Sequence, residues 1–150
     1  MAINVLELHH HAVRVPPAKA AEVSRFYEDV LGLQPDSRRP NIPSVPGSWM
    51  YVGAAGGPTA QIHIMGSEGN PPFAKSPQQD PTRFHVALAV DDIKAAQREL
   101  DRLGTAYWVI DGVVGPDAIQ VFLEDPAGNM IELHQIGTCN CNRLALNAAG

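Results

Sequence analysis

Cysteine is nearly absent from this chain of 150 residues. The two cysteines, Cys139 and Cys141, form the stretch CNC close to the C-terminus. A separation of two residues is a poor geometry for a disulfide within one strand, and intracellular chains seldom carry structural disulfides. A metal clip in this stretch would need two further ligands that it lacks. We therefore expect neither a disulfide nor a metal to stabilise the tail.

An excess of positive charge and long apolar runs are also missing. The formal net charge is -5 and the pI is near 5.6, whereas non-specific binding to nucleic acid or membrane surfaces needs clustered positive charge. No apolar run approaches the roughly 18 residues that cross a bilayer. The first residues, MAINVLELHH, do not resemble a secretory signal. We expect a cytoplasmic protein with no nucleic-acid partner and no membrane partner.

The first half of the chain has the pattern of a strand, a helix and further strands. In residues 8–15, LHHHAVRV, two valines occupy one face and His10, Ala12 and Arg14 the other. Two prolines then precede a helix that stops at Gly32. The apolar stripe of this helix consists of Val23, Phe26, Tyr27, Val30 and Leu31. A proline-rich loop and two short strands, SWMYVG and AQIHIMG, follow.

The second half repeats this order. The stretch FHVALAV alternates as a strand, and Asp91 or Asp92 is a good N-cap for the helix that follows and ends at Gly104. Three further strands are predicted, AYWVI, IQVFLE and MIELHQI. Superposing the two halves pairs Val15 with Val90, His10 with His85, Gly32 with Gly104 and His63 with Glu132. The chain is therefore an internal duplication, and its length suits one domain, residues 1–150.

The repeat separates the three consecutive histidines. His10 is the equivalent of His85 and lies opposite the valines that pack under the helix. His9 and His11 fall on the helix-facing side of the strand. We expect His9 to lie at a frayed strand end and His11 to be a core histidine with a hydrogen-bond partner.

Four polar side chains occupy equivalent places in the two halves and turn away from the helices. They are His10, His63, His85 and Glu132. Imidazole and carboxylate groups suit a divalent first-row metal, so these residues are candidate ligands of one ion.

The same stretches resemble the vicinal oxygen chelate superfamily, which includes glyoxalase I, methylmalonyl-CoA epimerase, fosfomycin-resistance proteins, extradiol dioxygenases and bleomycin-binding proteins. The matching motifs between Leu8 and Gln135 are HHAVRV, FYEDVLGL, AQIHI, FHVALAVDDI and FLEDPAGNMIELHQ. The resemblance implies an α+β fold of two tandem βαβββ modules, approximately residues 6–66 and 82–136, with a tail at 137–150. Their curved mixed sheet forms a cup with the helices outside and one divalent metal ion (Fe, Mn, Co, Ni or Zn) on its floor.

In this resemblance the four family ligand positions fall on His10, His63, His85 and Glu132. Three neutral imidazoles and one carboxylate leave a divalent ion with a formal charge of about +1, which favours an anionic ligand. The implied function is a metal-dependent lyase or isomerase of the glyoxalase type. It chelates vicinal oxygens of a small substrate and stabilises an enediolate-like anion, with Glu132 as the catalytic base.

Three alternatives stay open. An extradiol iron dioxygenase would use His10, His85 and Glu132 and leave His63 unligated. A non-catalytic protein would bind a drug or metabolite in the cup, and a thiol transferase would act on fosfomycin.

Substrate contacts are expected from cup-facing side chains that share the orientation of the ligands. These candidates are Arg14, Gln61, Arg83 and His134, with aromatic walls from Trp49, Tyr51, Trp108 and Phe122. Three loops, residues 35–47, 66–81 and 111–117, are long enough to cover a site. The expected partners are a small-molecule substrate and a second copy of the chain in a homodimer.

Overall fold

A single eight-stranded sheet carries the whole fold. The computed structural model describes residues 3–54, 59–116 and 118–137, so Cys139 and Cys141 lie outside the described residues. The elements in chain order are β1 (Val5–Val15), a 3₁₀ turn (Pro17–Lys19), α1 (Ala20–Asp29), β2 (Gln34–Pro35), β3 (Gly47–Tyr51), β4 (Gln61–Gly66), β5 (His85–Val90), α2 (Ile93–Leu103), β6 (Tyr107–Asp111), β7 (Ile119–Glu124) and β8 (Met130–Gln135).

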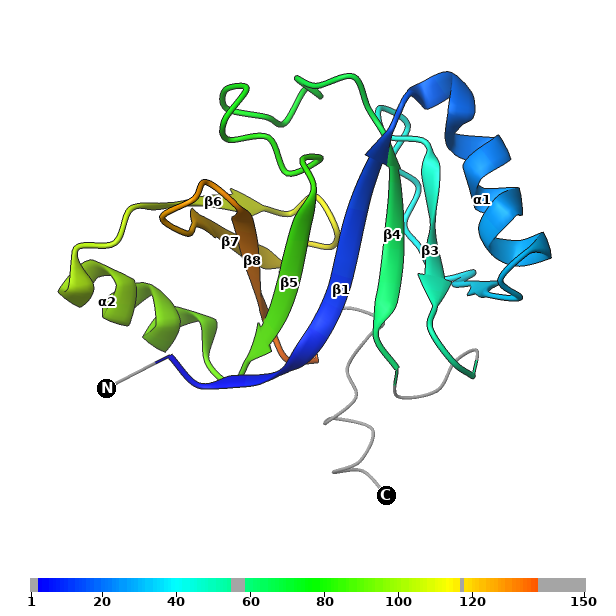
Figure 1. Cartoon of the computed structure of the whole chain (residues 1–150). Helices are drawn as coiled ribbons and strands as arrows, with labels where there is room; N and C mark the ends of the chain where they lie inside the picture. Colours follow the sequence, from blue (N-terminus) through cyan, green and yellow to red (C-terminus); the bar gives the residue numbers. More distant parts are fainter. Residues whose placement is uncertain (1–2, 55–58, 117, 138–150) are drawn as a thin grey trace.

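The sheet has the symmetry of a duplicated unit. Its strand order is β2-β3-β4-β1-β5-β8-β7-β6. β1 runs parallel to β4, β5 runs parallel to β8, and β1 meets β5 antiparallel at the centre. Figure 1 shows the sheet curving between α1 at one end and α2 at the other. The predicted α+β fold with one curved mixed sheet is confirmed.

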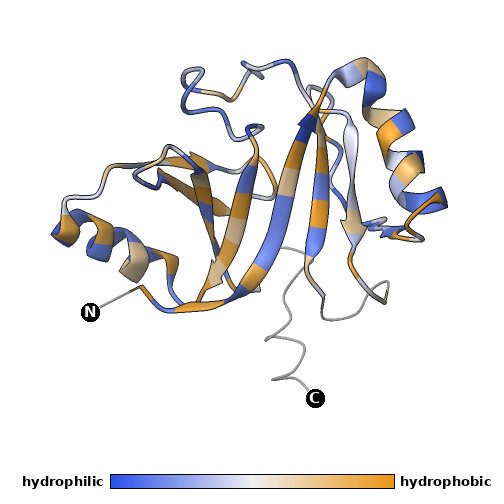
Figure 2. Cartoon of the chain, viewed as in Figure 1, coloured by the Kyte–Doolittle hydropathy of each residue, from blue (hydrophilic) through white to orange (hydrophobic). Residues whose placement is uncertain are grey.

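The helices cover one face of the sheet and leave the other for the polar residues. In the second half, Ile93, Ala96 and Leu100 of α2 pack with Val121 and Leu133 of the sheet. Successive residues of a strand point to opposite faces, so Glu132 and His134 turn away from α2. Figure 2 shows the same alternation of apolar and polar residues along β4. The sequence pattern therefore decides which face becomes the cup.

α2 begins and ends as its sequence suggests, whereas α1 ends at Asp29, before Gly32, and packs through a different stripe. The Asp92 side chain accepts a hydrogen bond from Ala95 N and caps α2, which ends at Gly104 in the left-handed conformation. In α1 the buried residues are Ala20 and Ser24, whereas Phe26, Val30 and Leu31 are more than half exposed. The predicted apolar stripe is wrong in these three positions. Ala20 and Ser24 are the buried residues of the helix, with Ser24 Oγ 2.8 Å from Ser48 Oγ of β3, and Val30 and Leu31 follow its last residue.

A β-bulge changes the side-chain order of β1. Leu8 pairs with Leu88 and His10 with Ala87, so His9 is one extra residue between two adjacent residues of β5. A bulge of this kind breaks strict alternation. As a result, His9 and His10 are both buried and His11 is exposed. The expectations of a frayed His9 and a buried His11 are therefore wrong.

Two rows of side chains cross the centre of the sheet. His10, Ala87 and Glu132 are direct partners across β1, β5 and β8, and Ala12 stands between His63 and His85 in the same way. Both alanines are fully buried. Because each central residue is small, the longer side chains on either side can converge over it.

No helix among the described residues is long and apolar enough to span a membrane.

We expect Ala87→Leu to disrupt this convergence. The added carbons would stand between His10 and Glu132, at an overpacking cost of about 1–3 kcal/mol. Urea denaturation should show the loss of unfolding free energy, and titration should show weaker binding of Zn²⁺. Val86→Leu enlarges the neighbouring residue on the opposite face and is the control. Unchanged Zn²⁺ affinity in Ala87→Leu would contradict the role of the small residue.

Candidate metal centre

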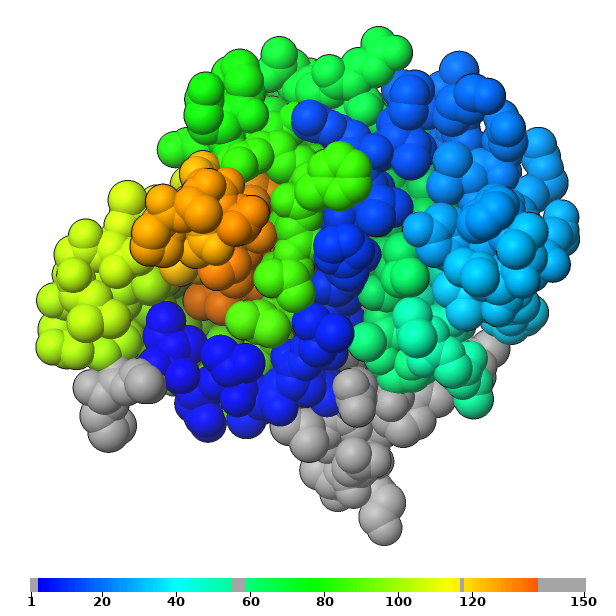
Figure 3. Space-filling view, in the orientation of Figure 1, coloured from blue at the N-terminus to red at the C-terminus, as the bar shows by residue number. Residues whose placement is uncertain are grey.

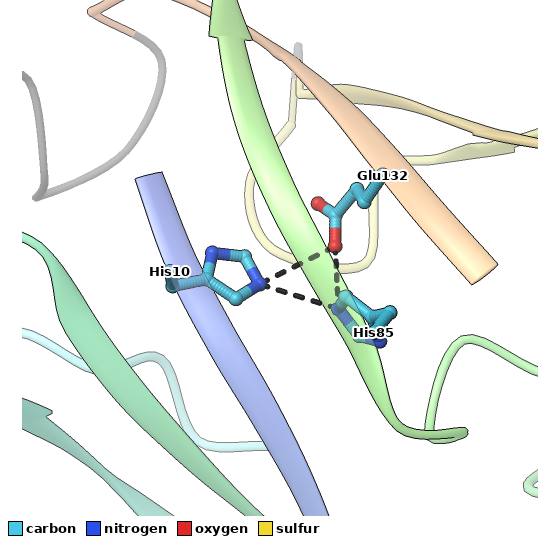
Figure 4. A group of neighbouring side chains, drawn as sticks. All are labelled: His10, His85 and Glu132. Atoms are coloured by element: carbon cyan, nitrogen blue, oxygen red, sulfur yellow. Dashed lines mark hydrogen bonds and ion pairs between the residues drawn. The ribbon is translucent and has the colours of Figure 1, made fainter. Parts of the chain in front are cut away.

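Three buried side chains from three neighbouring strands meet on the cup side of the sheet. They are His10 of β1, His85 of β5 and Glu132 of β8 (Figure 4). Their closest atoms are separated by 3.3 Å between His10 Nε2 and His85 Nε2, 3.4 Å between His10 Nε2 and Glu132 Oε2, and 2.9 Å between His85 Nε2 and Glu132 Oε2. Each of the three residues offers one ligand atom to the same small space.

These separations fit the ligand shell of a divalent ion. Ligand atoms roughly 2.1 Å from an ion lie about 3.0 Å apart in octahedral and about 3.4 Å apart in tetrahedral geometry. The three measured separations fall within or near this range. The three residues therefore have the spacing to form one side of a coordination shell, and the rest of the shell would face the cup.

The protonation pattern of His85 also suits a ligand. Its Nδ1 lies 2.7 Å from the carbonyl oxygen of Arg83, which can only accept, so Nδ1 carries the proton. In neutral His85 the Nε2 atom then presents a lone pair to Glu132 Oε2. Two acceptors this close repel each other unless a cation or a proton lies between them. A carbonyl that fixes the tautomer is a common support for metal-binding histidines.

His10 is held in a similar way by its sequence neighbour. His9 Nδ1 and His10 Nδ1 are 2.7 Å apart, so one of them donates to the other. If His10 Nε2 binds a metal, His10 must carry its proton on Nδ1 and donate it to His9. Burial lowers the pKa of His10 to about 3, which keeps the imidazole neutral, as metal binding requires.

One oxygen of the Glu132 carboxylate is held by two neighbouring groups. Gln120 Nε2 donates to Oε1 at 3.0 Å, and His134 Nε2 contacts the same oxygen. Burial raises the pKa of a carboxyl, but the neighbouring His134 and His10 outweigh this effect and hold the pKa of Glu132 well below its usual range. Glu132 therefore offers an anionic oxygen, Oε2, to the group, while its Oε1 is already oriented by the protein.

His63, the fourth ligand predicted from sequence, lies beside this group and outside it. Its ring stacks on His10 with centroids 3.8 Å apart and on Trp49 at 4.4 Å. Its Nε2 lies 2.9 Å from Gln61 Oε1, and Gln61 Nε2 donates to Asp36 Oδ2 at 3.0 Å. An ionised carboxylate accepts hydrogen bonds and donates none. The amide NH₂ of Gln61 therefore faces Asp36, and its oxygen faces His63. His63 Nε2 is then a donor, and its assignment as a ligand stays a prediction.

The four predicted substrate residues separate into two pairs. His134 lines the hollow beside the metal ligands, and Gln61 is buried behind His63. Arg14 and Arg83 line a second hollow, which the candidate ligand His85 also lines. Their contact with substrate stays a prediction.

Both arginines are already paired with acids. Arg14 Nη1 lies 3.2 Å from Asp80 Oδ2, and Arg83 Nη1 lies 3.0 Å from Glu124 Oε1. These ion pairs use part of the charge that a substrate anion would need.

A narrow hollow of about 30 Å³ adjoins His10 and Glu132. The three long loops all contribute to its wall: Arg39, Ile42 and Val45 come from the first, Phe73 and Pro81 from the second, and Val113 and Val114 from the third. Trp49 also lines it. The surface of the hollow is thus largely apolar, with the candidate ligands His10 and Glu132 among its lining residues.

His9 is one of the site residues that sequence reasoning missed, together with Arg39 and Gln120. His9 lines the hollow, and its ring stacks on His134 with centroids 4.5 Å apart. The three consecutive histidines were the available signal, but strict alternation assigned His9 to the wrong face.

The model of one protein family matches residues 7–133, most of the chain, under the description Glyoxalase/Bleomycin resistance protein/Dioxygenase superfamily. The chain belongs to this superfamily. No curated protein matches it with significant sequence similarity.

Solved structures similar to this superfamily member include methylmalonyl-CoA epimerases. One is 22% identical with a TM-score of 0.62, and the alignment covers 90% of this chain and 97% of the other. The enzyme from Mycobacterium tuberculosis is 21% identical with a TM-score of 0.64 and coverages of 90% and 91%. The Streptomyces coelicolor enzyme in complex with 2-nitronate-propionyl-CoA is 14% identical with a TM-score of 0.65 and coverages of 90% and 97%. At these identities the likeness establishes the shared fold.

We expect the metal content to separate the three converging residues from their neighbours. His10→Ala, His85→Ala and Glu132→Gln should each lose most Co²⁺ or Zn²⁺ after loading, as measured by mass spectrometry of the metal per chain. His11→Ala, an exposed change on the same strand, is the control. His63→Ala should keep its metal with an affinity lowered by no more than about tenfold. A loss in His63→Ala equal to that in His10→Ala would instead support four ligands.

Asp36 should make the stability of the protein sensitive to acid. Burial opposes its ionisation, but hydrogen bonds from the Arg38 backbone and from Gln61 lower its pKa below 3.8. A lowered folded pKa gives stability that is complete above the unfolded pKa and is lost as the pH falls through the folded pKa. Asp36→Asn should cost about 1–3 kcal/mol at pH 7.

The test is urea denaturation at pH 7 and at pH 3, with exposed Asp111→Asn as the control. The difference between the original protein and Asp36→Asn should shrink at the lower pH. An equal difference at both values would show that ionised Asp36 contributes nothing to the network.

Proposed function

We propose that this protein is a metal-dependent lyase or isomerase of the glyoxalase type, which binds two neighbouring oxygens of a small substrate. The observation that carries the proposal is the group His10, His85 and Glu132, which presents three ligand atoms to one small space. Two members of the group, His10 and Glu132, also line the hollow. A bound divalent ion supplies Lewis-acid stabilisation of negative charge developing on the substrate oxygens.

The residues of the chain would orient the candidate ligands and exclude water from the bound substrate. Trp49, Val113 and Val114 line the hollow and would exclude water around a bound substrate, which strengthens electrostatic interactions there. His9 would hold the imidazole of His10 in the tautomer that can bind a metal. The carbonyl of Arg83 would do the same for His85.

Glu132 is proposed first as a ligand. As the catalytic base predicted from sequence, it would have to release its contacts with His10 and His85 and turn toward the substrate. Its other oxygen is held by Gln120 and His134, and these contacts oppose such a movement. Glu132→Asp keeps the charge but shortens the side chain, so it tests position separately from charge.

An iron-dependent extradiol dioxygenase is the second candidate. A set of two histidines and one carboxylate on one side of the ion is typical of non-haem iron oxygenases, and the position of His63 outside the group favours this reading over four ligands. The dioxygenase reaction would consume dioxygen, whereas the lyase or isomerase reaction would exchange a carbon-bound proton of the substrate.

We expect metal-loaded protein to catalyse proton exchange at a carbon next to a chelating carbonyl. Protein purified without chelator would be analysed for metal and then supplied with methylglyoxal hemithioacetal in D₂O. Nuclear magnetic resonance should show turnover or deuterium incorporation that falls more than about 100-fold in His85→Ala. Exposed His11→Ala is the control.

Three results would contradict this function. Oxygen uptake with Fe²⁺ and a catechol, without proton exchange, would assign the dioxygenase. Tight binding of a small molecule with no turnover would assign a binding protein. Equal activity in the metal-free protein would remove the metal from the mechanism.

A homodimer and a cytoplasmic location are further proposals. Figure 3 shows β1 and β5 at the surface between the two helices, and Val5, Leu8 and Phe84 of this region are substantially exposed. A second copy of the chain would cover these apolar side chains. Sedimentation of Phe84→Glu against the original protein tests the dimer.

A further inference from the structure

Arg39 places a positive charge in the wall of the hollow without an acidic partner. Its side chain lines the hollow beside Ile42 and Val45. Its described hydrogen bonds go to two backbone carbonyl oxygens, Pro40 O at 3.3 Å and Val45 O at 2.7 Å. The Nε atom is buried and donates to no described group. A guanidinium has five N–H donors, so three remain beyond these two bonds.

The neighbouring arginine has a different environment. Arg38 Nε lies 3.2 Å from Asp36 Oδ1, and its Nη2 donates to Tyr51 Oη at 2.7 Å. Arg14 and Arg83, in the second hollow, are also paired with carboxylates. Among the described residues that line the hollow beside His10 and Glu132, Arg39 is the one with a permanently charged basic side chain. No ion pair joins it to a carboxylate of the described residues.

This arrangement has an energetic cost that a ligand can remove. Arg39 stays charged at any ordinary pH, although burial lowers its pKa. The adjoining wall is apolar, with Ile42, Val45 and Trp49, so the protein replaces only part of the lost hydration. A planar carboxylate matches the guanidinium donors and would restore the missing acceptors.

We propose that Arg39 binds a carboxylate group of the substrate while the vicinal oxygens of the same molecule lie at His10, His85 and Glu132. The placement of the chelated end rests on the proposed function, whereas the carboxylate contact depends on Arg39 alone. One guanidinium in an apolar wall matches a single negative charge. The substrate class is therefore a small carboxylic acid with two neighbouring oxygens at one end and an apolar body between the two polar ends.

The test compares three ligands that share one chelating group. Catechol supplies two neighbouring oxygens, protocatechuate adds a carboxylate to the same ring, and protocatechuamide replaces that carboxylate with an uncharged group of equal size. Binding to Zn²⁺-loaded and metal-free protein is measured by calorimetry, because Zn²⁺ does not support oxygen chemistry. The variants are Arg39→Met and Arg39→Lys, with Arg98→Gln on the exposed face of α2 as the charge control.

Protocatechuate should bind the original protein about 10- to 100-fold more tightly than protocatechuamide. This advantage should disappear in Arg39→Met, return in part in Arg39→Lys and remain in Arg98→Gln. Unchanged catechol affinity in Arg39→Met would show that the floor of the site is still intact. In metal-free protein both ligands should bind more weakly, with the advantage of the carboxylate preserved.

The outcomes separate this inference from the proposed function. If catechol binds the Zn²⁺-loaded protein but the carboxylate has no advantage, or keeps it in Arg39→Met, the role of Arg39 is overturned and the metal site stands. If catechol gains nothing from the metal while the carboxylate keeps an advantage that depends on Arg39, the chelating function is overturned and the role of Arg39 stands. If no ligand binds either form, both are overturned.

Discussion

The antiparallel pairing of β1 with β5 is the constraint on which the site depends. It joins the two repeats at the centre of the sheet and places His10 opposite Ala87, which in turn stands opposite Glu132 on β8. Residues far apart in the chain thus become neighbours in one row. A shift of one residue in this register would turn every side chain to the other face and would separate the ligands.

Hydrogen bonds then convert this proximity into a defined donor set. The carbonyl of Arg83 orients His85, His9 orients His10, and Gln120 with His134 orients Glu132. None of these supporting groups needs to touch a metal ion. They restrict the tautomers and rotamers of the ligands, so less ordering is left to occur when an ion binds.

Much of the site can be predicted from the sequence, because the alternation of residues along each strand and the internal repeat point to the same side chains. The duplication identified His10, His85 and Glu132, and the structure brings these three together. The positions of the residues around these three were predicted less well. The bulge that turns His9 inward depends on pairing with β5, and the orientation of His63 depends on Asp36 through Gln61. Such effects arise between distant segments, so the alternation within one strand does not contain them.

The residues outside regular strands were harder still to predict. Arg39 lies in a loop without periodicity, and only the folded chain reveals that its charge faces the hollow while Arg38 is paired. In α1, the helical period was correct, but the buried residues are Ala20 and Ser24 rather than those of the predicted apolar stripe.

The origin of the wall of the hollow separates two properties of the protein. The candidate ligands come from β1, β5 and β8, whereas much of the hollow is lined by three loops that follow β2, β4 and β6. Changes of sequence in those loops can alter the shape and charge offered to a ligand while the chelating face keeps its geometry. Selectivity can therefore be redesigned, by exchange of whole loops, on a scaffold whose reactive centre is left untouched.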